Sequence, residues 1–409
     1  MSRELLIEKW SGMDGKLSIK DIKDPYVREN LAVLLETQSI KDPVRELLGE
    51  ESTFSTTTPS SEDSGQFKPI ALALVRRTFP DLFANKVVPV QAMNGPVGLA
   101  FALRFMYKDG TSGYDPNREA AFNSVNIFSG FTGSTSGASA TADSGTGVST
   151  TEGESWQLNP GTGQMPELKL MLSRTAIEAK SRKLAASFSL EAAQDIKAMH
   201  DIDVEREMVN VLQYEVLAEL DRELVAKLKN VAVDPTKGGF AAATIDVSGS
   251  DGRWSQEKFA VVANTIVAQA NNIAISTRRG AGNFVIVSPR VATALQAAGR
   301  QFFTNNSANV AATTVLSEVG NINGVITVYR DSYASSDYAL TGYKGPGISD
   351  GGVVYSPYIM GLLSKAIQPD DFSPRVGVMS RYALTDSLLG AGRYYRLNNY
   401  TNLDKVLGI

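Results

Sequence analysis

Few side chains in this 409-residue sequence have the types and spacing that acid–base, nucleophilic or metal chemistry needs. There is no cysteine, which removes disulfides, thiolate metal sites and cysteine nucleophiles together. His200 is the only histidine, so the sequence has neither a histidine-rich metal site nor a histidine-based triad. An isolated imidazole can act as a pH switch, but we interpret His200 as a hydrogen-bonding or packing residue.

Two short clusters imitate functional sites. Glu152 and Glu154 could mimic paired catalytic carboxylates, yet they lie among glycine and serine and are predicted to be solvated charges. The Arg278-Arg279-Gly280-Ala281-Gly282 stretch lacks the spacing of a phosphate loop and precedes a predicted strand, where a phosphate loop would follow one. We interpret it as a turn. The sequence therefore predicts no enzyme and no cofactor, with an enzyme of an α/β family as an alternative.

The net charge and the hydropathy of the sequence exclude some classes of binding partner. Forty Lys and Arg against 44 Asp and Glu give a formal net charge of −4, and the only adjacent arginine pairs noted are Arg76-Arg77 and Arg278-Arg279. A protein that grips nucleic acid usually carries a basic patch, so we expect any DNA nearby to be enclosed without sequence-specific binding. No apolar run approaches the length that crosses a bilayer, and the charged N-terminus is not typical of a signal peptide. We expect synthesis in the cytosol and no membrane contact.

The N-terminal region divides in two. Residues 1–50 are rich in charge and contain short amphipathic stretches, notably residues 27–36, which predict small helices with little shared core. Residues 51–66 are rich in serine and threonine, a composition typical of a linker. The sequence therefore predicts a domain boundary near residue 66.

A strand, a long loop and a long helix follow. Residues 97–106 are typical of a strand, and residues 108–163 are rich in Gly, Ser and Thr, as in a long exposed loop or a linker. Alternation resumes over residues 169–190. Residues 204–229 carry an apolar residue at every fourth position, so the apolar stripe winds around a predicted helix about 40 Å long.

Residues 250–350 predict a separate α/β unit of alternating helices and strands. Its elements are a helix from Ser255, a strand at Phe284–Val287, a helix that Ser288 and Pro289 begin and Gly299 ends, and a strand at residues 325–329. After Pro357, alternation through Val376 and Val378 predicts strands that return to the central domain.

Four stretches, in the same order, resemble the major head proteins of T-even-type tailed phages. They are Val75-Arg76-Arg77-Thr78-Phe79-Pro80-Asp81-Leu82 continuing to residues 90–98; Ile177-Glu178-Ala179-Lys180-Ser181-Arg182-Lys183-Leu184 continuing to residues 189–200; Arg279-Gly280-Ala281-Gly282-Asn283-Phe284-Val285-Ile286; and Val328-Tyr329 to Gly342-Tyr343-Lys344-Gly345, then Tyr355-Ser356-Pro357-Tyr358. Together they span residues 67 to about 385. Relatives with a large insertion domain have many more residues between the first two stretches, so we expect no full insertion domain here.

The resemblance implies an α+β, Hong Kong 97-like phage capsid fold. Its parts would be an N-terminal arm or propeptide with its linker at residues 1–66, an arm continuing into the peripheral domain at 67–99, an extended loop at 100–170, a peripheral domain with a long spine helix at 171–249, an axial α/β domain at 250–350, and a C-terminal return to the peripheral domain at 351–409.

The same resemblance implies a function. The chain would be a major capsid protein that self-assembles, through hexameric and in some shells pentameric capsomers, into an icosahedral or prolate head enclosing double-stranded DNA. Expected partners are a head protease, a scaffold, a portal and vertex or decoration proteins. The expected location is the virion, and the host cytoplasm during assembly. An encapsulin-like compartment shell is the alternative.

The related head proteins lose an N-terminal segment after a Leu/Ile-x-Glu sequence, and Leu48-Gly49-Glu50 fits beside the predicted linker. The motif also occurs at Leu6-Ile7-Glu8, Leu34-Leu35-Glu36, Leu217-Ala218-Glu219 and Leu316-Ser317-Glu318. Some relatives of the fold cross-link a loop lysine to an asparagine, but nothing in the sequence marks Lys108 as reactive.

Overall fold

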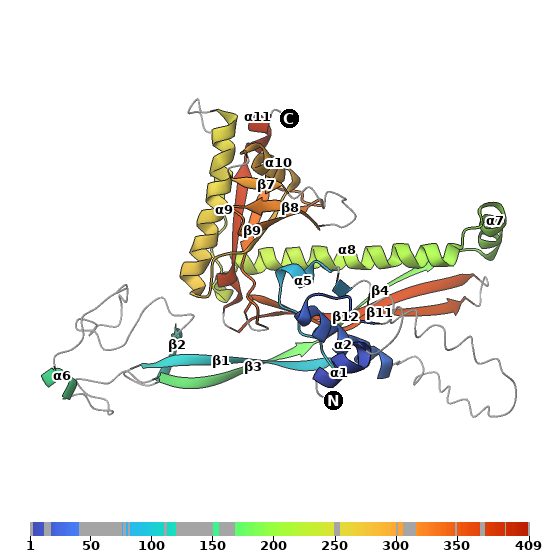
Figure 1. Cartoon of the computed structure of the whole chain (residues 1–409), viewed down its shortest axis with the longest axis horizontal. Coiled ribbons are helices and arrows are strands. Elements are labelled where there is room, and N and C mark those ends of the chain that lie inside the picture. Colours follow the sequence, from blue (N-terminus) through green and yellow to red (C-terminus); the bar gives the residue numbers. More distant parts are fainter. Residues whose placement is uncertain are drawn as a thin grey trace. The chain divides into compact units, whose positions relative to one another are not determined.

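The computed structural model describes residues 3–11, 18–40, 76, 79–80, 82–109, 113–119, 150–154, 168–248, 254–299, 302–305, 316–347, 350–368, 373–388 and 390–407. The chain divides into two compact units. Figure 1 labels the helices and strands of both. The first unit takes Met1–Gly98, Ala176–Lys227 and Val353–Thr385, and the second takes Leu99–Thr175, Leu228–Gly352 and Asp386–Ile409.

The first unit joins helices to a three-stranded sheet. Its helices are α1 (Arg3–Ser11), α2 (Pro25–Ile40), α5 (Ala84–Val87), α7 (Leu190–His200) and most of α8 (Val204–Val233), and its strands are β4 (Lys180–Ser187), β11 (Val353–Ile367) and β12 (Pro374–Asp386).

The two N-terminal helices share a core. Trp10 of α1 and Leu31 and Leu35 of α2 are all buried. The Trp10 indole Nε1 donates to the Glu36 carboxylate at 3.1 Å, and Lys9 Nζ forms an ion pair with the same group at 2.7 Å. The expectation of little shared core is therefore wrong, because α1 and α2 pack together and both bury large apolar side chains.

The sheet of the first unit has the strand order β11-β12-β4. β12 and β4 are antiparallel, with Val376 opposite Ala186 and Val378 opposite Leu184. Leu212 of α8 packs in one cluster with these two valines. The predicted alternation after Pro357 is therefore confirmed, and it gives the sheet an apolar face that α8 covers.

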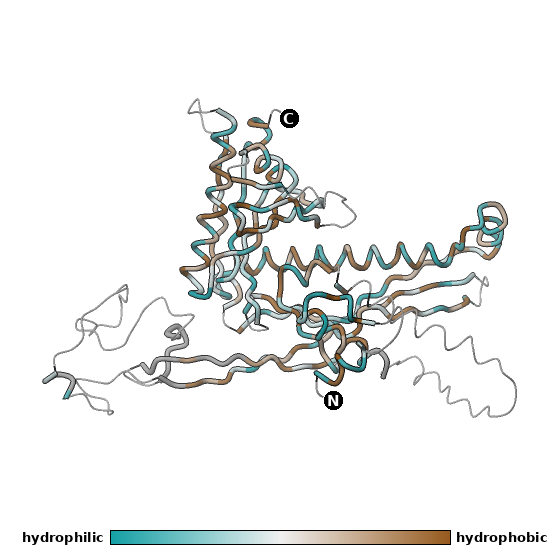
Figure 2. Tube along the Cα trace, viewed as in Figure 1, coloured by the Kyte–Doolittle hydropathy of each residue, from teal (hydrophilic) through white to brown (hydrophobic). Residues whose placement is uncertain are grey.

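The long helix α8 has 30 residues and is therefore about 45 Å long. The helix predicted at residues 204–229 is confirmed and continues for about one more turn. Asp203 lies just before it, and its carboxylate accepts from the Glu205 backbone N–H at 3.2 Å. Apolar and polar segments alternate along the whole of α8 (Figure 2), as expected when different parts of one helix pack on different partners.

The second unit holds two sheets. Its strands are β1 (Val97–Asp109, whose first two residues lie in the first unit), β2 (Gly113–Glu119), β3 (Leu168–Glu178, whose last residues lie in the first unit), β5 (Ala243–Asp246), β6 (Phe284–Val287), β7 (Phe303–Asn305), β8 (Leu316–Ile322), β9 (Ile326–Asp331), β10 (Tyr338–Gly342) and β13 (Tyr395–Thr401). Its helices are α6 (Thr150–Glu154), η3 (Pro235–Lys237), α9 (Ser255–Thr277), α10 (Pro289–Ala297), η5 (Ala391–Tyr394) and α11 (Leu403–Leu407).

The larger sheet has the order β5-β13-β10-β6-β9-β8-β7. β6 pairs in parallel with β9, and β13 pairs in parallel with β5. Helices α9 and α10 contribute Val262, Ile266 and Leu295 to a core that also holds Val285 and Val287 of β6. Both helices and the buried strand β6 confirm the elements predicted for this stretch.

Residues outside 250–350 also enter this sheet. β5 precedes the stretch, and β13 follows it and pairs with β10 from Tyr338↔Asn399 to Gly342↔Tyr395. Residues 386–409 thus belong to the α/β unit, whereas the sequence predicted that all of residues 351–409 return to the other domain. The difference arises because pairing partners far apart in the chain leave no local signal.

Helix α9 is long and apolar enough to cross a membrane by length and composition, and it is the one such helix in the part of the chain that the structure describes. Phe259, Val262, Ile266, Ala270 and Ile273 on one of its faces are buried. By this measure the expectation that no apolar run approaches membrane-spanning length is wrong, although the face that carries these five residues is buried within the chain.

The smaller sheet has the order β2-β1-β3. The strand predicted at residues 97–106 is confirmed as β1. β1 and β2 are antiparallel, with Met106 opposite Glu119 and Lys108 opposite Tyr114. Lys108 therefore lies within a strand pair.

Candidate assembly surface and the cluster beside the spine helix

Strands β1 and β3 expose an apolar stripe. Leu99, Phe101 and Phe105 alternate along one face of β1 and are 49%, 57% and 41% exposed. Leu170 and Leu172 share a face of β3 and are 57% and 64% exposed. Alternate residues of a strand point to the same side, so each strand presents an apolar row. We call these five residues the β1/β3 stripe.

Exposed apolar rows of this kind are unusual on a protein that works alone. Large contiguous apolar patches mark surfaces that another molecule covers. The β1/β3 stripe is therefore the strongest candidate for a protein-binding surface among the described residues.

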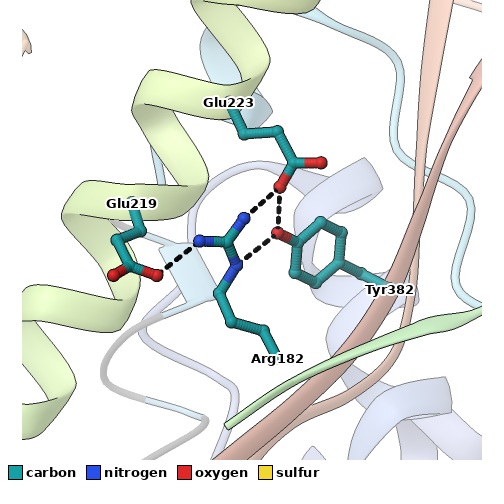
Figure 3. Close-up of polar contacts among 4 residues, drawn as sticks. All are labelled: Arg182, Glu219, Glu223 and Tyr382. Carbon is teal, nitrogen blue, oxygen red and sulfur yellow. Dashed lines mark hydrogen bonds and ion pairs between the residues drawn. The ribbon is translucent and has the colours of Figure 1, made fainter. Parts of the chain in front are cut away.

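A polar cluster joins the spine helix α8 to the sheet of the first unit (Figure 3). Arg182 of β4 donates through Nε to the Tyr382 hydroxyl of β12 at 3.0 Å and through Nη2 to Glu223 of α8 at 2.6 Å. Its Nη1 forms an ion pair with Glu219, and the Tyr382 hydroxyl donates to Glu223. One guanidinium thus ties three elements together.

Charge and burial set the protonation states in this cluster. Burial, followed by the hydrogen bond to Glu223, raises the pKa of Tyr382. Burial alone would lower the pKa of Arg182, but its bonds to Glu219, Tyr382 and Glu223 raise it above the ordinary value. The phenol of Tyr382 therefore stays neutral and the guanidinium of Arg182 stays charged, an arrangement that holds three elements in place.

Asp221 lies on α8 between the two carboxylates of the cluster in sequence. It is 7% exposed, and its Oδ1 has no hydrogen-bond partner in the described part of the chain. Burial raises the pKa of Asp221 to about 7. Tyr355 of β11 is fully buried, and its pKa is raised first by burial and then by electrostatic interactions with Tyr382, Asp221 and Glu223. A buried carboxylate without a donor penalises the ionised state.

The candidate cleavage residues Leu48, Gly49 and Glu50 lie outside the described residues. The four other copies of the motif all lie within regular structure. Leu6-Ile7-Glu8 is in α1, Leu34-Leu35-Glu36 in α2, Leu217-Ala218-Glu219 in α8 and Leu316-Ser317-Glu318 in β8. Glu36 and Glu219 are also held by the contacts to Trp10 and Arg182.

The other candidate residues from the sequence lie at exposed or helix-capping positions. His200 is exposed at the end of α7, and Glu154 is exposed in α6. Arg278 caps the C-terminus of α9 with a left-handed backbone and is followed by the turn into β6, which confirms the interpretation of Arg278–Gly282 as a turn. No group of three His, Cys, Asp or Glu side chains able to hold a metal occurs among the residues for which the structure gives positions.

Sequence reasoning missed the Arg182 cluster. Its one local signal is the spacing of Glu219 and Glu223, which lie four apart and so on one face of a helix. The arginine and the tyrosine that complete the cluster are distant in sequence from that pair.

The chain is similar to known head-shell proteins. The family model described as "Major capsid protein Gp23" matches residues 64–404. The major capsid protein of Enterobacteria phage T4 is 28% identical, over an alignment that covers 83% of this chain and 79% of that protein. The major capsid protein of Serratia phage KSP90 is 30% identical over 385 residues, which cover 88% of this chain and 85% of that protein. Among solved structures, a chain of "The capsid of Myoviridae Phage XM1" is 10% identical, with a TM-score of 0.40 and coverage of 78% of this chain and 91% of that one.

These matches define a shell-building protein of tailed phages. The chain belongs to the Gp23 family of major capsid proteins. The resemblance seen in the sequence is confirmed, and with it the α+β, Hong Kong 97-like fold, of which the long helix, the extended strands and the α/β unit are all present. The encapsulin-like alternative finds no support among these relatives.

Proposed function

We propose that the chain builds its shell by laying the β1/β3 stripe on a neighbouring copy of itself. The observation that carries this proposal is the exposure of Leu99, Phe101, Leu170 and Leu172 in the isolated chain. Burying an apolar side chain of this size contributes about 1.5–3 kcal/mol before the losses of association are subtracted. Repeated at every subunit of a closed shell, such contacts give a stable particle from individually weak bonds.

The parts of the fold take separate tasks in this proposal. Residues 100–170 act as the extended loop that reaches a neighbour, residues 171–249 supply the spine helix of the peripheral domain, and residues 250–350 with β5 and β13 line the capsomer axis. Capsomers are hexameric, and pentameric where the same protein also closes the vertices. The protein has no catalytic task of its own.

Other partners follow from the family. A scaffold and a portal would direct assembly in the host cytoplasm, a head protease would process the subunit, and vertex or decoration proteins would join the finished shell. The net charge of −4 suits a wall that encloses double-stranded DNA without sequence-specific binding.

We place processing after Glu50. Every other copy of the motif is in a helix or strand, and cleavage there would need local unfolding. Removal of residues 1–50 would take away α1 and α2 together.

The assembly proposal is tested by a paired substitution, Phe101→Ser with Leu172→Ser. The variant subunit should keep the circular dichroism and thermal midpoint of the parent, because both side chains are exposed, but it should fail to form particles in sedimentation. The matched control is Val325→Ser, an equally apolar residue that is 69% exposed in the turn between β8 and β9. Particles formed by the paired variant as readily as by the parent would contradict the proposal.

A further inference from the structure

Residues 89–93 form an extended segment that uses one of its two edges inside the first unit. Gln91 N–H donates to the Tyr355 carbonyl at 2.8 Å, Met93 N–H to the Pro357 carbonyl at 2.9 Å, and Tyr355 N–H to the Pro89 carbonyl at 3.0 Å. The segment thus adds a short parallel strand beside β11.

The opposite edge of the segment is occupied by side chains of α2. The Val90 N–H donates to the Tyr26 hydroxyl at 3.2 Å, and that hydroxyl donates in turn to the Val90 carbonyl. Asn30 Nδ2 donates to the same carbonyl at 3.1 Å, and the Ala92 N–H donates to Asn30 Oδ1 at 3.3 Å. Two side chains therefore take the hydrogen bonds that a neighbouring strand would otherwise make.

The hydrogen-bonding pattern of residues 89–93 indicates what kind of backbone their second edge can bind. In a strand the N–H and C=O groups of alternate residues point to opposite sides, and here the groups of Val90 and Ala92 face away from β11. An uncovered edge of this kind binds extended backbone and has little preference for side chains. A helix whose side chains cover it prevents that pairing while the helix remains in place.

We infer that α2 is a removable cover for a β-edge, and that removal of residues 1–50 frees Val90–Ala92 to pair with an extended strand from a second copy of this chain. The inference rests on the proposed processing after Glu50. A second copy is the occupant because the shell places copies in contact, and because β3 is an outer strand of the described β2-β1-β3 sheet, which presents the β1/β3 stripe. The order of events then follows, because subunits cannot pair through this edge until processing has occurred.

The cover is tested on the full-length subunit by hydrogen exchange at the Val90 and Ala92 amides. In the variant Tyr26→Phe with Asn30→Leu, which keeps bulk but removes the bonding groups, both amides should exchange at least about tenfold faster than in the parent. The matched control is Thr37→Val on the same helix, since the Thr37 hydroxyl donates to the Val33 carbonyl at 2.9 Å and, among the described residues, does not contact the 89–93 segment. Unchanged exchange in the paired variant would overturn the assigned role of Tyr26 and Asn30.

The pairing is tested on mature particles assembled from equal amounts of ¹⁵N-labelled and unlabelled subunits that carry a photoreactive side chain at position 91. The inference predicts chains that begin at Glu51, slow exchange at Val90 and Ala92, and cross-links that join labelled to unlabelled peptides. Chains that begin at Glu51 but exchange freely there, or that link only peptides of the same label, would overturn the pairing and leave the processing intact. Chains that keep residues 1–50 would instead overturn the processing, and with it the uncovering of this edge.

Discussion

Arg182 connects α8 to the β11-β12-β4 sheet of the first unit. Its guanidinium serves the Tyr382 hydroxyl and the carboxylates of Glu219 and Glu223 at once. Its side chain is 30% exposed, and the two carboxylates are 46% and 43% exposed, so water weakens each ion pair. The cluster depends on geometry, because a guanidinium presents its donors in a fixed planar fork, whereas an ammonium is a compact point charge with rotatable donors.

Two substitutions of Arg182 distinguish the contribution of its charge to stability from that of its hydrogen-bonding geometry. We expect Arg182→Met to lower the free energy of unfolding by about 1 kcal/mol, because the two carboxylates are partly exposed and Glu223 keeps the Tyr382 hydroxyl as a donor. Arg182→Lys should recover only part of that loss. Chemical denaturation of the unassembled subunit measures both, and full recovery by lysine would contradict the geometric account.

Ionisation of Asp221 should lower the stability of the folded chain as the pH rises, whereas an ordinary paired carboxylate raises it. Its pKa is raised from 3.8 to about 7 by burial, so between these values the folded state binds more protons than the unfolded state. Stability should therefore fall as the pH rises from about 4 to about 7, by as much as roughly 4 kcal/mol from this one group, and then level off.

The substitution Asp221→Asn removes that penalty. The variant should gain thermal stability over the parent at pH 8 and gain little at pH 5. Asp195→Asn on the exposed helix α7 is the control and should show no such pH-dependent gain. Equal effects of Asp221→Asn at both pH values would mean that the carboxyl is not ionised against a burial penalty.

At the scale of elements, local patterns predicted more than long-range pairing did. Helix α9, strand β6 and the start of α10 at Ser288 follow from apolar spacing and capping residues, and all three lie where expected. The positions of β5 and β13 were not predictable, because a strand's sequence does not name the strand that it will join. The same reason hid the contacts of Tyr26 and Asn30 with Val90, which is about sixty residues away.

In the second unit, the backbone of η5 lies very close to the backbone at Gly239. A Cβ added at Gly392 in η5 would lie 2.3 Å from the Gly239 amide nitrogen and 2.5 Å from its Cα. Since neither partner is a movable side chain, Gly392→Ala must shift the backbone. We expect a loss of about 1–3 kcal/mol in the free energy of unfolding, typical of overpacking.

Gly95→Ala is the control for this effect. A Cβ there would meet its nearest atom, the Val97 carbonyl oxygen, at an ordinary 3.6 Å. Its thermal midpoint should match the parent's within experimental error. A Gly392→Ala subunit as stable as the Gly95→Ala subunit would show that the two segments separate without loss.

At the scale of the whole molecule, the sequence predicted the class of protein better than its assembly contacts. Four ordered stretches were enough to indicate the family, and the shortage of histidine and cysteine pointed away from catalysis. The β1/β3 stripe could not be recognised in advance, because alternating apolar residues are equally typical of a strand buried in its own domain. Only the structure shows that nothing within the described chain covers those residues.

The exposed stripe and the covered edge place two assembly surfaces on one subunit. The first is available at once and favours early, reversible contacts. The second becomes available only after residues 1–50 are removed, which would add bonds late, in a protein that has no cysteine for covalent locking. A shell built in this order lets misplaced subunits leave before the later contacts form.

The most direct test of self-assembly is sedimentation of the purified full-length protein together with the intact mass of its subunits. The account predicts large closed particles, and, when the head protease is present, a subunit that begins at Glu51. Particles of intact chains in the presence of that protease would remove the processing step alone. Small soluble oligomers, under conditions in which the related capsid proteins form shells, would contradict the central claim that this chain builds a capsid by itself.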